Sequence, residues 1–369
     1  MKNKKLLISI GIVVVLAIVT FGIYRSRQQT TDSNVIRIGA ILPLTGVYGA
    51  VGENTLQGIK LALDDVKQIY PALQINLLIE DGKGEIKSSI NSFNKLMTKE
   101  IEAIIAMGTY QVEAVAPLAA QVHLPMIALG DPNAQFLDCN SEQTWVFSTF
   151  LSTMLAGQKI AEYAIKENYK RIAILYLNAQ LGMETTNAFI EVYERLGGTV
   201  VAKEVFEENS LNFRESIAKV IGQNTDAFCI FGYGPGYCNV INQVREAGFN
   251  GIILTNDAVV GRDSQSILKR LDNIVYTFPE VPTSSEYQQV KNRFETLYGK
   301  NIDIFAAYGY DSVMILAKSM IEAREKHLPT NQILLGFKNV KILMGEISFL
   351  ANGDCIVPIQ LLKLESDKK

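Results

Sequence analysis

The chain has 369 residues, of which 48% are hydrophobic, 20% charged and 9% aromatic, with 27 Gly and only 10 Pro. This composition is typical of a folded globular protein and excludes a disordered, collagen-like or coiled-coil chain. The 35 Lys and Arg against 38 Asp and Glu give a formal charge of −3, so the chain carries no excess positive charge with which to hold nucleic acid.

The amino terminus combines positive charge with a long apolar run. Three Lys among the first five residues precede the uncharged, mostly apolar run from Leu6 to Tyr24. As a helix, this run nearly matches the hydrocarbon core of a bilayer, about 30 Å. A signal peptide has a shorter apolar region, about 7 to 15 residues, and a small-residue cleavage site, for which Thr20-Phe21-Gly22 is a weak candidate. We predict an uncleaved membrane anchor at 6–24, with a cleaved signal as the alternative; both place the remainder outside the cytoplasm.

From Val35 onward, short apolar runs typical of strands alternate with segments of helical periodicity. The first half has strands predicted at 35–42, 73–80, 101–106 and 125–129, and a helix with an apolar stripe of Leu56, Ile59, Leu63, Val66 and Ile69. The second half has strands at 171–177, 199–206, 226–231 and 251–255, with helices near 182–196, 212–222 and 236–247. Continuous apolar strands joined by helices indicate parallel sheets covered on both faces. We predict an α/β fold with two such sheets.

The last third breaks this alternation. After a strand at 273–278 come two helices, about 285–298 and 304–325, and then paired strands near 342–350 and 355–364. The two helices lack a sheet of their own, so we expect them to cover an existing one and the chain to cross between domains through a hinge. The expected units are an anchor and stalk at 1–34, a first lobe at 35–149 plus about 281–335, and a second lobe at 150–280 plus about 336–369.

Ligands of open α/β sheets bind beyond the carboxyl ends of the strands. The loops at those ends contain Gly, Thr, Tyr and Asp, and lie at 43–49, 108–110, 130–132, 232–236 and 256–258. Glycine lets a ligand approach the backbone, while hydroxyls and helix starts supply hydrogen bonds, so the loops suit a small polar molecule. Simpler roles remain open: Thr109 could cap a helix, Asp257 could cap a short segment, and 232–236 could be only a tight turn.

The sequence gives little support for catalysis. It lacks a dinucleotide or P-loop glycine pattern, and its two His have no evident nucleophile partner. Its four Cys include no Cys-x-x-Cys pair, so we expect no metal, no cofactor and no enzyme. Buried free thiols are one interpretation of the Cys residues, Cys139 and Cys355 included, and a Cys229–Cys238 disulfide is the pairing to test first.

Five segments, in this order, carry a family resemblance: IRIGAILPLTGVYGAVGENTLQGIKLALDDV at 36–66, AMGTYQVEAVAPLAAQVHLPMIALGDP at 106–132, RIAILYLNAQLGMETTNAF at 171–189, DAFCIFGYGPG at 226–236 and AAYGYDSVMILAKSMIEA at 306–323. Together they resemble the type I periplasmic binding proteins of the leucine/isoleucine/valine-binding family. The resemblance implies two Rossmann-like domains joined by three crossings, a ligand held in the cleft between them, and delivery of amino acids or related solutes to an ABC importer permease. Relatives that sense amides or form receptor ectodomains make a membrane-anchored sensor the alternative function.

The resemblance also implies roles for individual residues. Thr109 matches the residue that holds the ligand carboxylate, Tyr233 matches a cleft tyrosine of the second domain, and Asp257 matches the acid that pairs with the ligand ammonium. Tyr110 and Gly130 occupy adjoining cleft positions.

Three positions depart from the family pattern. Leu181 stands where an aromatic residue is expected, and Val51 where a Tyr is expected, with Tyr48 as a substitute from nearby. Asp131 introduces an acid beside the expected carboxylate site. If Asp131 points inward, the ligand lacks a free α-carboxylate and is an amide, a urea-like donor or a cation; if it points outward, ordinary amino acids fit. The expected ligand is therefore an amino acid or an amide-like solute.

Overall fold

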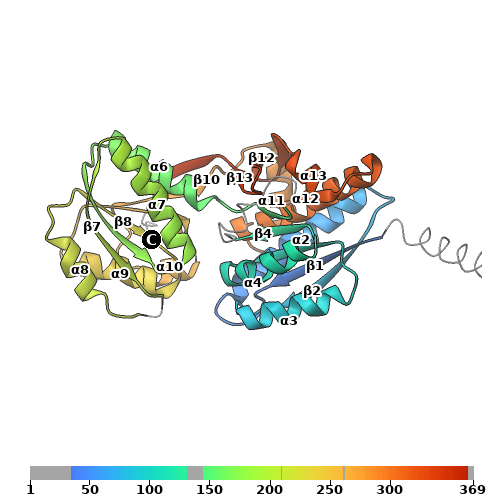
Figure 1. Ribbon diagram of the computed structural model, residues 1–369, viewed down its shortest axis with the longest axis horizontal. Helices are drawn as coiled ribbons and strands as arrows, with labels where there is room; N and C mark the ends of the chain where they lie inside the picture. The colour runs from blue at the N-terminus through green and yellow to red at the C-terminus, as the bar shows by residue number, and fades with distance from the viewer. Residues whose placement is uncertain (1–34, 131–143, 209, 261, 365–369) are drawn as a thin grey trace, which may run out of the picture.

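The structure, a computed structural model, describes residues 35–130, 144–208, 210–260 and 262–364. Figure 1 shows two lobes side by side, each built on its own sheet. The predicted α/β fold of two parallel-sheet domains is confirmed, and the eight strands predicted in the two alternating halves lie within two residues of their observed bounds. The predicted anchor at 6–24 lies outside the described residues. Within the described part, no helix has the length and apolar character needed to cross a membrane.

The first lobe is built on a five-stranded parallel sheet in the order β2-β1-β3-β4-β5. Its strands are β1 (Val35–Leu42), β2 (Gln74–Asp81), β3 (Ala103–Met107), β4 (Met126–Leu129) and β5 (Val146–Ser148). Side chains alternate between the two faces of a strand. Ile38 of β1 therefore packs with α2 (Gly49–Ile69) and α12 (Ile304–Lys326), whereas Ile41 packs with α3 (Ile86–Met97) and α4 (Thr109–Gln121).

The α2 and α12 helices cross with almost no space between their backbones. A β-carbon on Gly58 of α2 would lie 1.8 Å from the carbonyl oxygen of Ala306, and one on Gly309 of α12 would lie 2.3 Å from the carbonyl oxygen of Thr55. Helices α11 (Ser285–Tyr298) and α13 (Thr330–Leu335) also pack on this lobe. The late helices thus cover an existing sheet, as predicted. Ile69, expected on the buried stripe, is 54% exposed because it is the last residue of α2.

The second lobe has a six-stranded sheet in the order β14-β10-β9-β8-β6-β7, parallel except for β14. Its strands are β6 (Arg171–Leu177), β7 (Thr199–Phe206), β8 (Ala227–Phe231), β9 (Ile252–Thr255), β10 (Ile274–Pro279) and β14 (Ile359–Lys363). Two layers of helices cover it: α6 (Thr153–Lys166) and α7 (Gln180–Arg195) on one face, α8 (Arg214–Ile221) and α9 (Gly234–Glu246) on the other. The Cys229–Cys238 disulfide, the pairing to test first, is absent, because Cys229 packs in the core on the α7 face and Cys238 in the core on the α9 face. Cys229, Cys238 and Cys355 are buried thiols, as the other interpretation expected, and Cys139 lies outside the described residues.

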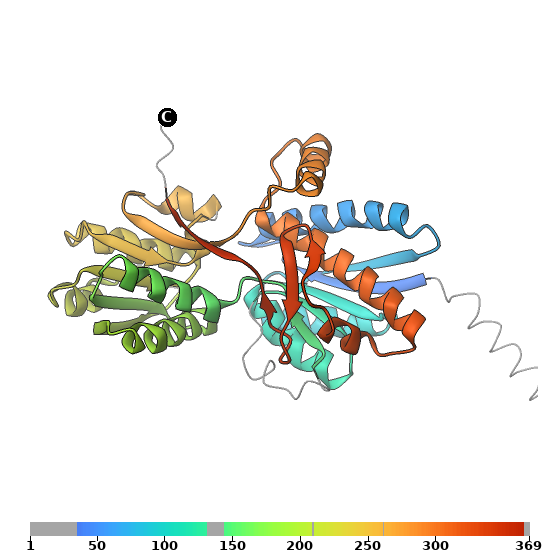
Figure 2. The same cartoon turned by 90° about the horizontal axis from the view of Figure 1, so that it is seen from above.

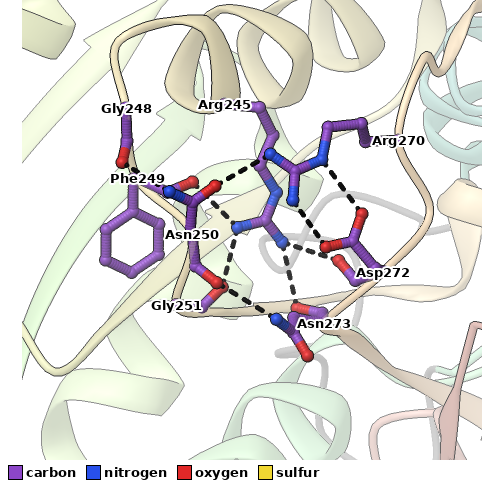
Figure 3. Close-up of polar contacts among 8 residues, drawn as sticks. All are labelled: Arg245, Gly248, Phe249, Asn250, Gly251, Arg270, Asp272 and Asn273. Atoms are coloured by element: carbon purple, nitrogen blue, oxygen red, sulfur yellow. Dashed lines mark hydrogen bonds and ion pairs between the residues drawn. The ribbon is translucent and has the colours of Figure 1, made fainter.

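A buried arginine holds the edge of this sheet where the strands begin. Figure 3 shows the guanidinium of Arg245 surrounded by main-chain carbonyl oxygens of the loops that lead into β9 and β10. It donates to Phe249 at 3.0 Å, Gly251 at 2.7 Å, Asp272 at 2.8 Å and Asn273 at 3.2 Å. Burial lowers the pKa of Arg245. Ligand sites lie at the opposite, carboxyl ends of such strands, so this polar cluster is structural.

The chain passes between the lobes three times: after β5, after β10 and before β14 (Figure 2). A small antiparallel sheet of β11 (Val340–Ile342), β12 (Gly345–Phe349) and β13 (Cys355–Ile356) packs into the core of the first lobe, and only β14 joins the second sheet. The expected division assigned everything after about 336 to the second lobe. The buried apolar side chains of 343–357, however, belong to the same core as those of α12, in the first lobe. We propose lobe limits of 35–149 with 281–357, and 150–280 with 358–364.

A cleft between the lobes

A cavity of about 1350 Å³ lies between the lobes and is lined by residues from both. Six of the seven predicted ligand residues line it together: Tyr48, Thr109, Tyr110, Gly130, Tyr233 and Asp257. Asp131 lies outside the described residues, so neither of its two orientations is tested. The cavity exceeds the usual range for small-molecule sites, about 300–1,000 Å³. The fold therefore brings loops from both sheets to one common space.

On the first lobe, Asp81 fixes the loop that carries Tyr48. Its Oδ1 accepts hydrogen bonds from the backbone N–H groups of Leu44, at 3.0 Å, and Lys83, at 2.9 Å. Its Oδ2 accepts a hydrogen bond from the Thr45 hydroxyl at 2.5 Å. Burial alone would raise the pKa of Asp81, but these hydrogen bonds to the charged carboxylate outweigh it and lower the pKa. Asp81, the last residue of β2, thus fixes a loop that lines the cleft.

The start of α4 faces the same cavity. Gly108 precedes the helix with φ of +95°, a conformation that favours glycine. Thr109 is the first helical residue and lines the cavity, and the cap position is occupied by Gly108, which makes no side-chain hydrogen bond. Thr109 therefore does not cap α4, the simpler role considered for it. The first N–H groups of a helix have no partner within the helix and attract negative charge, so the backbone at the start of α4 suits an anionic or acceptor group.

On the second lobe, Asn256 ties two cavity loops together. Its side-chain oxygen accepts from the N–H of Gly232 and its amide donates to the carbonyl of Gly232, both at 3.1 Å. These two hydrogen bonds fix the backbone next to Tyr233, which follows Gly232, and next to Asp257, which follows Asn256. Burial raises the pKa of Asp257 to about 6 and is the main cause that raises the pKa of Tyr233. Both side chains reach the cavity, so the 232–236 segment is a tight turn and also part of the cleft wall.

Glu208 joins the lobes at the cleft, and the sequence reasoning missed it. Its Oε1 accepts a hydrogen bond from the Tyr48 hydroxyl at 3.1 Å, and its Oε2 accepts one from the Tyr110 hydroxyl. Both tyrosines belong to the first lobe, whereas Glu208 follows β7 of the second. The rule that ligands bind beyond the carboxyl ends of strands could have found it, because Glu208 lies two residues beyond the end of β7.

A group of apolar and aromatic residues that line the cavity was also not predicted. It combines side chains from β10 and the residues after it, from α11, and from the start of α12 and the loop before it. Its members are Tyr276, Phe278, Val281, Tyr287, Ile302, Ile304 and Phe305. Leu181 and Val51, the positions that depart from the family pattern, line the cavity as well. The cleft thus offers a polar region rich in tyrosine and an apolar region, so it suits a ligand with both characters.

The chain is similar in sequence and in fold to known solute-binding proteins. A curated relative, the Leu/Ile/Val-binding protein BraC3 of Rhizobium johnstonii, is 23% identical over 329 residues, which cover 86% of this chain and 88% of BraC3. The solved structure of the branched-chain amino acid substrate-binding protein LivJ from Streptococcus pneumoniae, in complex with isoleucine, aligns with a TM-score of 0.77 at 21% identity, covering 89% of this chain and 96% of LivJ. A solute-binding protein from R. palustris, in complex with benzoate, aligns with a TM-score of 0.76 at 18% identity, covering 90% of this chain and 93% of that protein.

The family match covers both lobes. A family model described as periplasmic binding protein matches residues 35–354, which include every residue that lines the cavity. Members are solute-binding proteins that lie outside the cytoplasm, homologous to the substrate-binding proteins of ABC transporters that bind amino acids. The chain therefore belongs to the type I periplasmic binding proteins of the branched-chain amino acid family.

Proposed function

We propose that this protein is an extracytoplasmic solute-binding protein whose two lobes close on a small polar solute, an amino acid or an amide-like molecule, and deliver it to an ABC importer. The observation that carries the proposal is the single cavity whose polar side chains come from both lobes. Three short crossings between lobes allow a hinge motion. A ligand that contacts both lobes stabilises the closed state in proportion to its differential affinity for that state.

The ligand residues we propose are Thr109, Tyr110, Gly130 and Tyr48 on the first lobe, and Tyr233 and Asp257 on the second. Asp131 belongs to the same proposal through its neighbour Gly130. The start of α4 offers N–H donors to an acceptor group of the ligand, while the Asp257 carboxylate offers a partner to a nitrogen group. No residue is assigned a catalytic role.

A binding screen tests the proposal directly. The domain from Val35 onward is heated with amino acids, amides, polyamines and nucleosides, each in large excess. A ligand at 100 times its dissociation constant stabilises the folded protein by about 2.7 kcal/mol, which raises the melting temperature measurably. Small-angle scattering with the best ligand should then show a smaller radius of gyration. If no solute raises the melting temperature, the proposed function is wrong; unchanged scattering with a bound ligand would contradict only the closing motion.

We also propose that residues 6–24 keep the mature protein at the membrane. The length of the apolar run and the weak cleavage site support this. Membrane fractionation followed by amino-terminal sequencing tests it. Protein found in the soluble fraction, with an amino terminus beyond Gly22, would show that the segment is a cleaved signal.

A further inference from the structure

Two tyrosine hydroxyls on one wall of the cleft share a single acceptor. Tyr48 and Tyr110 both line the cavity, and both donate to the Glu208 carboxylate, one to each oxygen. An ionised carboxylate only accepts hydrogen bonds. The direction of both bonds is therefore fixed: the tyrosines donate and Glu208 accepts.

This direction decides what the tyrosines offer to a ligand. A tyrosine hydroxyl has one proton to donate and lone pairs that accept. When the proton goes to Glu208, the oxygen can only accept from another group. Burial, and then the hydrogen bond to Glu208, raise the pKa of Tyr110, so its hydroxyl keeps that proton at physiological pH. The tyrosine end of the cleft is thus an array of acceptors beside a negative charge.

The backbone holds Glu208 in this position. A β-carbon on Gly236, in the first turn of α9, would lie 2.2 Å from the main-chain oxygen of Glu208. A β-carbon on Gly234, which has φ of +77°, would lie 3.1 Å from Oε1 of the same residue. Two glycines at the start of α9 therefore leave the space in which Glu208 approaches the tyrosines.

We propose that Glu208 is a specificity-determining residue. By taking the hydroxyl protons of Tyr48 and Tyr110, it leaves both oxygens able only to accept hydrogen bonds from a ligand. The site therefore selects a ligand group that carries N–H donors, such as an ammonium or a primary amide, over a carboxylate. This inference rests on the proposed function and narrows its ligand class. A carboxylate at the tyrosines would be repelled by their oxygen lone pairs and by the negative charge of Glu208. An N–H donor would find hydrogen-bond acceptors there, and an ammonium would also be attracted by the charge of Glu208. Glu208 acts through the tyrosines and is a positioning residue.

Two matched pairs of probes test the inference. Benzamide is compared with benzoate, and 3-methylbutylamine with 3-methylbutanoate, because each pair differs chiefly in the group that donates or accepts. Dissociation constants are measured by calorimetry on the soluble domain. We expect each nitrogen probe to bind wild type at least about tenfold more tightly than its matched acid, a difference of about 1.4 kcal/mol.

The decisive variant is Glu208→Gln, which keeps the shape and adds a donor. Its amide would donate to one tyrosine oxygen and turn that tyrosine's proton toward the cavity, so the preference for the nitrogen probe should fall about tenfold or reverse. Glu215→Gln is the matched control, because the Glu215 side chain is 90% exposed on α8 and loses the same charge. It should keep the wild-type preference.

Tyr110→Phe separates selection from lobe closure. Loss of the acceptor should weaken the nitrogen probes about tenfold and leave the acids unchanged, whereas a residue that only latches the lobes would weaken both kinds equally. Circular dichroism and the melting temperature without ligand verify that each variant folds. The inference is wrong if the acids bind wild type as tightly as the nitrogen probes, if neither nitrogen probe binds, or if Glu208→Gln keeps the preference. A solute found in the wider screen would leave the proposed function standing in each of these cases.

Discussion

The Asn256 side chain makes two hydrogen bonds with the backbone of Gly232, one in each direction, and so joins the turn after β9 to the turn after β8. Asn256 is 3% exposed, so water cannot replace these bonds. The two residues that we propose as ligand contacts on the second lobe, Tyr233 and Asp257, are their direct neighbours. One amide side chain therefore sets the spacing of that half of the site.

Replacing Asn256 with Ala should cost both stability and binding. The N–H and C=O of Gly232 would be left buried without their partner, at roughly 1–3 kcal/mol for each unsatisfied group. We expect urea unfolding to show a loss in that range and calorimetry to show weaker binding of any ligand found in the screen. Asn250→Ala, on the loop before β9, is the control, because its side chain is exposed and water can replace its hydrogen bonds with Gly248 and Arg270. Equal stability of wild type and Asn256→Ala would contradict the assigned role.

Replacing Gly58 with Ala should destabilise the first lobe. The new β-carbon would collide with the Ala306 carbonyl oxygen, and forcing α2 and α12 apart costs about 1–3 kcal/mol in a packed core. Gly222→Ala is the matched control, because nothing lies within 4 Å of the position and φ of −82° suits alanine. Thermal unfolding of the two variants gives the comparison; a Gly58→Ala protein as stable as Gly222→Ala would refute the tight crossing.

Cationic ligands should bind more weakly below pH 6. In the free protein the pKa of Asp257 is raised to about 6 by burial, so its carboxyl group is mostly protonated at pH 5. A ligand ammonium favours the carboxylate and lowers this pKa, so binding must release a proton, and affinity should fall up to about tenfold per pH unit below 6. Calorimetry between pH 5 and 7.5 measures the effect.

Two variants test whether Asp257 causes this pH dependence. Asp257→Asn should bind a cationic ligand weakly and with the same affinity at both pH values. The pKa of Glu113, on the first lobe, is also raised, by burial and then by the charge of Glu184 on the second lobe. Glu113 could therefore contribute to the pH dependence, so Glu113→Gln must be measured in parallel. If the pH dependence vanishes in Glu113→Gln and persists in Asp257→Asn, the assignment to Asp257 fails.

Replacing Asp81 with Ala should weaken ligand binding and also lower stability. The loop that carries Tyr48 would lose three hydrogen bonds to a charged acceptor, and a mispositioned Tyr48 should lower affinity roughly tenfold. Glu80→Ala is the neighbouring control, because Glu80 pairs with Lys95 on the surface and faces no cavity loop. Similar ligand affinity in the two variants would exclude the positioning role of Asp81.

The strands and most of the cleft could be predicted because their signals are local. Continuous apolar runs such as 171–177 are long enough to define a buried parallel strand, and the carboxyl ends of such strands point to the ligand loops. This reasoning placed Thr109 and Asp257 in ligand loops without knowledge of their contacts. It also placed the two late helices on an existing sheet.

The remaining features depend on how distant segments meet, which no local pattern encodes. Glu208 gains its role only from two tyrosines on the other lobe. Spacing along the chain suggested Cys229 and Cys238 as the pair to test, because it does not show that they lie on opposite faces of one sheet. We propose a different lobe for the short strands of 340–356 than the sequence indicated, because runs of two to five residues carry too little periodicity to indicate which core they join.

The three crossings also impose an order on folding as the chain emerges, amino terminus first, outside the cytoplasm. Strands β6 to β10 of the second lobe are continuous in sequence, so most of that sheet can form from one uninterrupted segment. The first lobe cannot, because the apolar face of β1 and α2 is covered by α12 and by β12, which are made last. The apolar surface of β1 and α2 therefore stays exposed to solvent until the second lobe has formed. This interval is when the chain is most exposed to aggregation, and when a chaperone would recognise its first half.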